Sequence, residues 1–180
     1  MGWANRSAWQ SEIDLNLSRP PPRSHPLTAL LPTDPTDRRS LTPADSARWV
    51  SFNSFVARLL DSSIVPWIEL PIWSLRESLE SDLSTLPTPL HRDTQILTAC
   101  HWAVWARDLI LRQSQASKEL SESETRSLRP GELYDGPSGY SLPRLRFWES
   151  RLRELKDQEG LSEQVKAAVE KATNALDGQR

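Results

Sequence analysis

Apolar residues recur three and four positions apart along most of the chain, which is the period of one face of an α-helix. The first of these stripes follows Thr42-Pro43-Ala44-Asp45, a typical helix start with a capping hydroxyl, an initial proline and an early carboxylate. We therefore predict a helix from residue 43 to about residue 60. Its inward stripe consists of Trp49, Phe52, Val56, Leu59 and Leu60. The residues expected to lie mostly away from that stripe are Ser51, Asn53 and Arg58.

Prolines set the expected starts of the next two helices. Pro66 and Pro71 forbid an uninterrupted helix, so the second begins near one of them and continues to about residue 83, antiparallel to the first. Thr88-Pro89 then repeats the start signal of the first helix. The third helix, from about residue 90 to residue 113, is apolar around almost its whole circumference, so we expect it at the centre of the fold.

Two further helices are expected in the C-terminal part. Residues 117–125 are rich in Ser and Glu, which is typical of a solvated connection, and a glycine-punctuated turn follows over residues 131–139. Ser141 is placed to cap a fourth helix that Gly160 ends, and a fifth helix extends from residue 162 to about residue 176. The sequence thus predicts an all-α fold of five or six helices packed around the third.

Proline distribution divides the chain into two parts. Residues 20–43 contain seven of the fourteen prolines, a composition typical of an extended linker. The spacing of Pro32 and Pro35 also fits a polyproline ligand, but the fuller motif is missing and a plain linker is favoured. We predict a short helix and a partly disordered Pro-rich linker over residues 1–42, and a helical domain over residues 43–177. The short helix is indicated by an apolar stripe of Trp9, Ile13 and Leu17.

The charge balance does not suit a nucleic-acid-binding protein. The chain has 22 basic and 24 acidic residues, a net charge of −2 and a sequence pI of about 6.0. No run approaches the roughly twenty apolar residues of a membrane-spanning helix, and the N-terminus lacks the apolar core of a secretory signal. Cys100 is the single cysteine, so an intrachain disulfide is excluded, which suits a reducing compartment. We expect an intracellular protein, cytoplasmic or nuclear, without nucleic-acid or membrane partners.

Eight tryptophans are many for 180 residues, and most of them fall on the helical stripes where a core is expected. The alternative is an aromatic binding pocket, because two tryptophans lie three apart on the central helix and further aromatic residues follow in the C-terminal half. Arg144 lies one turn before Trp148, where it either stacks on the indole or binds an anionic ligand. The candidate binding residues are Trp102, Trp105, Tyr134, Arg144 and Trp148.

Catalytic signatures are missing from the sequence. His101 is expected in the apolar core, and a proton-transfer role would require a carboxylate such as Glu80 or Asp108 beside it. The simpler expectation pairs Arg76 with Glu80 and Asp108 with Arg112 on the helix surface. The histidines are scattered and Cys100 has no partner at ligand spacing, so we predict no metal site. Phosphate-binding and nucleophile motifs are likewise lacking, so we predict no cofactor and no catalytic residue.

Four segments, in this order, resemble a large, mainly fungal helical family known as domain of unknown function 3632. They include Trp49-Val50-Ser51-Phe52-Asn53, Ile72-Trp73-Ser74-Leu75, His101-Trp102-Ala103-Val104-Trp105, and Gly131-Glu132-Leu133-Tyr134-Asp135-Gly136-Pro137 through Phe147-Trp148. The resemblance covers roughly residues 45 to 157 and implies a helical fold and a fungal source, with no assigned activity or cofactor. Leu145 departs from it, standing where such proteins often carry Trp. The Pro-rich tract also departs, standing where they usually have further helices.

Two functions remain open at this point. The leading hypothesis is a helical interaction or structural module without catalytic activity, which acts through its surface on a protein partner. The competing hypothesis is a small-molecule binding protein or an accessory biosynthetic enzyme that uses the five candidate residues around one pocket. A homodimer is a further alternative, because the fourth helix carries a leucine stripe suited to a core or to an interface. That stripe includes Leu145, Leu152 and Leu155.

Overall fold

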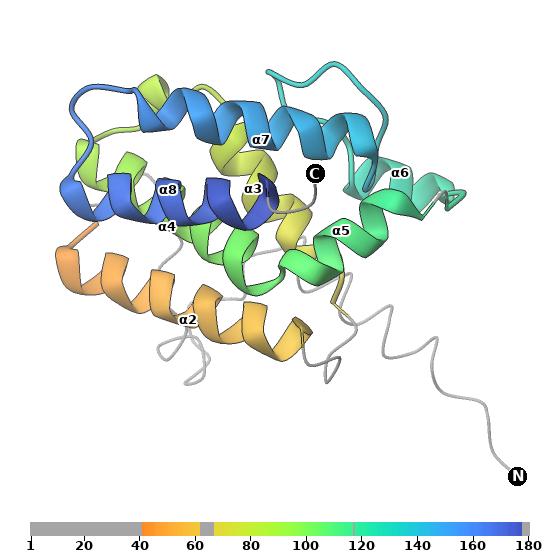
Figure 1. The fold of residues 1–180 in the computed structure, drawn as a ribbon, viewed down its shortest axis with the longest axis horizontal. Coiled ribbons are helices and arrows are strands. Elements are labelled where there is room, and N and C mark those ends of the chain that lie inside the picture. The colour runs from red at the N-terminus through yellow and green to blue at the C-terminus, as the bar shows by residue number, and fades with distance from the viewer. Residues whose placement is uncertain (1–40, 62–66, 117, 178–180) are drawn as a thin grey trace, which may run out of the picture. The chain divides into compact units, whose positions relative to one another are not determined.

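The computed structural model describes residues 41–61, 67–116 and 118–177, and in these ranges it contains only helices, turns and loops. The described part has seven α-helices, one short 3-10 helix and no strand, which confirms the predicted all-α fold (Figure 1). The predicted N-terminal helix and the Pro-rich linker lie outside the described residues. The elements are α2 (Pro43–Asp61), α3 (Leu70–Leu79), η1 (Leu83–Thr85), α4 (Pro89–Trp105), α5 (Arg107–Gln115), α6 (Glu122–Ser127), α7 (Leu142–Lys156) and α8 (Glu163–Asp177).

Capping side chains fix the starts of the long helices where the sequence predicts them. The Thr42 hydroxyl accepts a hydrogen bond from the backbone N–H of Asp45 at 3.2 Å, directly before α2. Thr88 caps α4 and Ser141 caps α7 in the same way, and a proline follows each of them in the first turn. The second helix begins near Pro71, not Pro66, because Pro71 occupies its first turn.

The expected third helix is two helices. Ala106 has φ −107° and ψ 21°, outside the α-helical region, so α4 ends at Trp105 and α5 begins at Arg107. Neither proline nor glycine occurs at this position, so nothing local in the sequence announces the break. The second helix is also shorter than expected, since Leu83 belongs to η1 and not to α3.

The most enclosed helix is α4, which packs against α2, α3 and α8, while α7 packs on α8 (Figure 1). The core it shares with them includes Ile96, Ala99, Trp102 and Ala103. However, α4 also buries His91, Thr94, Gln95 and Thr98, so the expectation of a central helix that is apolar almost all round is not confirmed. Three leucines of the fourth predicted helix, Leu145, Leu152 and Leu155, are buried in this core.

The buried side of α2 differs from the predicted stripe. Ser46 lies 2.6 Å from the hydroxyl of Thr94, and Asn53 accepts a hydrogen bond from the Trp102 indole at 2.9 Å. These polar contacts turn Asn53 toward α4 and leave Phe52 facing outward, 41% exposed. The predictions for Phe52 and Asn53 are therefore wrong, because hydrogen bonds between helices orient α2 as much as its apolar residues do.

Part of the connection expected to be solvated forms the short helix α6. Ser121 and Glu124 make a reciprocal capping box at its start, and Lys118 donates to Glu124 at 2.7 Å. These bonds to Lys118 and Ser121 lower the pKa of Glu124 from its ordinary 4.5 to about 2.

We expect α6 to loosen as pH falls through the interval from about 4.5 to about 2, because a lowered pKa means that the stabilisation is present above the unfolded-state value and is lost below it. An NMR titration of the Ser121 and Glu124 amides measures this midpoint. The variant Glu124→Gln should abolish the transition, whereas Glu122→Gln in the same turn should leave it in place. A midpoint near 4.5 in the parent chain would contradict the capping geometry.

Candidate functional site

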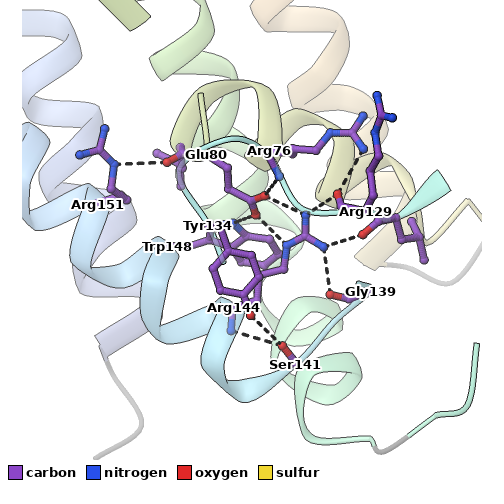
Figure 2. Close-up of polar contacts among 12 residues, drawn as sticks. Arg76, Glu80, Arg129, Tyr134, Gly139, Ser141, Arg144, Trp148 and Arg151 are labelled. Carbon is purple, nitrogen blue, oxygen red and sulfur yellow. Dashed lines mark hydrogen bonds and ion pairs between the residues drawn. The ribbon is translucent and has the colours of Figure 1, made fainter. Parts of the chain in front are cut away.

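Three of the five candidate binding residues come together around Glu80. Tyr134, Arg144 and Trp148 gather at the carboxylate that follows α3 (Figure 2). Trp102 and Trp105 lie on α4, outside this group. We call the group formed by Glu80, Arg144, Trp148 and the backbone of residues 128–139 the Glu80 cluster.

A buried ion pair forms the centre of the Glu80 cluster. The Arg144 Nε donates to Glu80 Oε1 at 2.6 Å, and Nη2 donates to Oε2 at 2.9 Å, so the pair is bidentate (Figure 2). Both side chains have an exposed fraction of 0%. Two charges in such a position are stable only when their remaining hydrogen-bonding positions are also filled.

The protein itself fills those positions. Glu80 also accepts from the Trp148 indole and from the Gly131 backbone N–H, each at 2.7 Å. The remaining donors of Arg144 reach the backbone carbonyls of Leu128 at 2.7 Å, Arg129 at 3.1 Å and Gly139 at 3.2 Å. A guanidinium has five N–H groups and a carboxylate about four acceptor positions, so the pair keeps no capacity for a ligand.

These bonds attach the loop between α6 and α7 to α3. Glu80 directly follows α3 as its C-cap, and its carbonyl accepts from the N–H of Leu133 at 2.9 Å. Two side chains of α3 add contacts to the same loop, since Trp73 and Arg76 donate to the Ser127 carbonyl at 3.2 and 3.1 Å. Burial lowers the pKa of Arg76 here, with a further contribution from the nearby Arg144. The Glu80 cluster thus holds α3 against α7 and the loop before it, although these segments are distant in sequence.

Aromatic rings enclose the guanidinium. The Arg144 Cζ lies 5.5 Å from the ring centroids of both Tyr134 and Trp148, so the predicted contact with Trp148 is present. Behind them, Tyr140 donates its hydroxyl to the Ile68 carbonyl at 2.6 Å, and burial raises its pKa well above the ordinary value of 10. The polar atoms of Arg144, Trp148 and Tyr140 are therefore all hydrogen-bonded within the protein.

The predicted surface ion pairs are wrong. Glu80 pairs with Arg144, 64 positions away, and not with Arg76. Asp108 pairs with the adjacent Arg107 at 2.8 Å and not with Arg112. Glu80 is thus paired across the fold and Asp108 within the first turn of α5, and neither forms the expected i,i+4 pair.

His101 has no carboxylate partner in the described part of the chain. Its Nδ1 is buried and accepts no hydrogen bond there. Burial lowers the pKa of His101, and the nearby cations Arg58 and Lys171 lower it further. The imidazole is therefore neutral at physiological pH and lies beside positive charges.

The two remaining candidates have separate environments. Trp102 is buried and donates to Asn53. Trp105 is half-buried, with the Arg58 Cζ 4.1 Å and the Lys171 Nζ 5.2 Å from its ring centroid. Sequence reasoning missed both cations, since they come from α2 and α8 and only the packing of the two helices on α4 brings them to the indole.

Two cavities lie away from the five candidates. The larger, about 350 Å³, is a polar cleft between η1, the start of α4 and the end of α7, with Asp82, Arg92 and Arg151 in its wall. Its arginines already bond to Asp93 and Glu154. The smaller, about 40 Å³, is lined by residues such as Ile68 and Tyr140.

Among the described residues no group of ligating side chains is placed to hold a metal ion, and no described helix is long and apolar enough to cross a membrane. Cys100 is buried, and burial raises the pKa of its thiol to about 12. The thiol is therefore protonated at neutral pH, which does not suit a nucleophile.

The outward side of α2 carries two exposed phenylalanines. Phe52 and Phe55 are 41% and 59% exposed, and Arg48 and Arg58 flank them one turn away on either side. We call this surface of Arg48, Phe52, Phe55 and Arg58 the α2 face.

A family model described as "Protein of unknown function (DUF3632)" matches residues 4–152. Neither the curated proteins nor the solved structures contain a significant match to the chain.

Proposed function

We propose that this chain, which belongs to the family described as Protein of unknown function (DUF3632), is an interaction module without catalytic activity. In this proposal the helical body is a rigid support, and the α2 face binds a segment of another protein. The family description names no reaction, so the argument depends on the surface and on the buried groups of this chain.

The exposure of Phe52 and Phe55 carries the proposal. Burying a phenylalanine side chain is worth about 1.5–3 kcal/mol, so two of them on the solvent side of one helix forgo a substantial stabilisation. Exposed apolar patches with a polar rim commonly mark sites of protein association. The α2 face has this form, since arginines stand at both ends of the aromatic pair.

The competing small-molecule function has less support. Tyr134, Arg144 and Trp148 are buried and engaged with Glu80, so a ligand would have to replace internal hydrogen bonds. Trp102 is committed to Asn53. We also propose an intracellular location, because the single cysteine is a buried thiol and needs no oxidising compartment.

Site-specific crosslinking tests the proposed surface. A photoreactive phenylalanine analogue replaces Phe55 in the full chain, and a matched control carries it at Glu163 of α8, whose side chain is 90% exposed. In cells that express the protein, we expect a discrete crosslinked product from position 55 and none from position 163. The same products from both positions, or none from either, would refute the α2 face as the binding surface.

A further inference from the structure

Positive charge gathers at one end of the α2 face. Arg58 from α2 and Lys171 from α8 both approach the ring of Trp105, at 4.1 Å and 5.2 Å from its centroid. Neither of them forms an ion pair in the described part of the chain, and both are exposed. The whole protein has a net charge of −2, so this end of the surface opposes the overall sign.

The Trp105 indole offsets part of the repulsion between the two cations, because the faces of an aromatic ring are negative. His101 is the third titratable group here, and its lowered pKa reflects burial together with the field of Arg58 and Lys171. An anion placed between the two cations would relieve their repulsion further.

The apolar residues of the α2 face lie next to Arg58 on the same helix. Phe52 stands three positions before Phe55, and Phe55 three positions before Arg58, so each side chain neighbours the next along the helix surface. At the other end, Arg48 is already 3.4 Å from Asp45 and is partly neutralised. The surface therefore has an apolar centre and one strongly basic end.

Building on the proposed function, we propose that the α2 face binds an acidic amphipathic helix of a partner protein. Leucine-like residues three and four apart on the partner cover Phe52 and Phe55, and a carboxylate on the same side binds between Arg58 and Lys171. A second copy of this chain fits less well. Antiparallel pairing of two α2 helices about a twofold axis would place Arg48 against Arg58 of the other copy.

Selection from a helical peptide library tests the proposal with the full chain. The library fixes leucines at i, i+3, i+4 and i+7 and lets the other positions vary among Glu, Gln and Lys. We expect binders enriched in Glu at positions flanking the leucines. Their affinity should fall about tenfold or more in Arg58→Glu/Lys171→Glu and in Phe52→Ser/Phe55→Ser, and should fall when salt rises from about 0.05 M to about 0.5 M.

A matched variant controls for net charge. Arg112→Glu/Arg126→Glu makes the same change of charge at two exposed positions on α5 and α6 and should keep the parent affinity. Changing the selected Glu residues of the peptide to Lys should restore binding to Arg58→Glu/Lys171→Glu. Thermal melting of each variant checks that its fold is intact.

Several outcomes overturn the inference, and they separate it from the proposed function. Binders that depend on Phe52 and Phe55 but show no preference for Glu would leave the α2 face as a binding surface while refuting the acidic partner. A concentration-dependent dimer that Phe52→Ser/Phe55→Ser abolishes would identify a second copy as the occupant. A library without binders would also refute the acidic helix, whereas crosslinking at position 55 reports on the proposed function independently.

Discussion

Replacing Glu80 with glutamine is expected to reduce the free energy of unfolding by about 3–5 kcal/mol, because it leaves the buried guanidinium of Arg144 without a countercharge. The glutamine amide also turns an N–H donor toward either Arg144 or the Gly131 N–H, where only an acceptor fits. The total free energy of unfolding of a small domain is roughly 5–15 kcal/mol, so the expected loss is a large fraction of it. Chemical denaturation followed by tryptophan fluorescence measures it.

Two companion variants make this result interpretable. Glu159→Gln, an exposed position after α7, should change stability by less than about 0.5 kcal/mol. The double variant Glu80→Gln/Arg144→Gln should recover part of the loss, since it removes both charges and keeps side-chain amides for some of the hydrogen bonds. A Glu80→Gln change of under about 1 kcal/mol would mean that water reaches the pair and that the Glu80 cluster is not closed.

Replacing Gly131 with alanine is expected to cost roughly 2–4 kcal/mol. An added Cβ would lie 2.6 Å from the Cβ of Glu80 and 2.7 Å from its carbonyl oxygen. The loop cannot retreat from this contact without losing the bond from Gly131 N–H to Glu80 and that from Leu133 N–H to the Glu80 carbonyl. Thermal and chemical denaturation give the size of the effect.

Gly160→Ala is the matched control for this change. Gly160 has φ 75°, but a Cβ added there meets nothing within 4 Å. The alanine variant at this position therefore measures the cost of backbone strain alone, which we expect to be about 1–2 kcal/mol. The larger loss should come from Gly131→Ala, accompanied by weaker protection of the Leu133 amide from hydrogen exchange. Equal losses would indicate that the loop moves freely away from α3.

Local signals in the sequence were sufficient for the starts of the helices. A hydroxyl followed by proline predicts the beginnings of α2 and α4, and Ser141 predicts that of α7, because capping involves only neighbouring residues. The break at Ala106 was not predictable in this way, since that residue has no local preference for leaving a helix. The packing of α4 and α5 against the rest of the fold decides where this break falls.

The Glu80 cluster was only half visible in the sequence. The spacing of Arg144 and Trp148 places both on one side of a helix, and the glycine turn brings Tyr134 near them. The sequence predicts an ion pair between Glu80 and Arg76, because spacing along a helix reveals only partners three or four positions away. The same limit hid the orientation of α2, where Asn53 is buried by a contact with Trp102 that spans 49 positions.

The position of Glu80 has a consequence for synthesis of the chain on the ribosome. A carboxylate at the C-cap of α3 opposes the helix dipole, and the groups that compensate it come from residues 128–148. The end of α3 therefore lacks these partners until Trp148 has emerged, and in a nascent chain that stops before α7 the Glu80 carboxylate stays in water. Early folding of the N-terminal helices as an independent unit is disfavoured, so the domain acquires its final form late, nearly in one step.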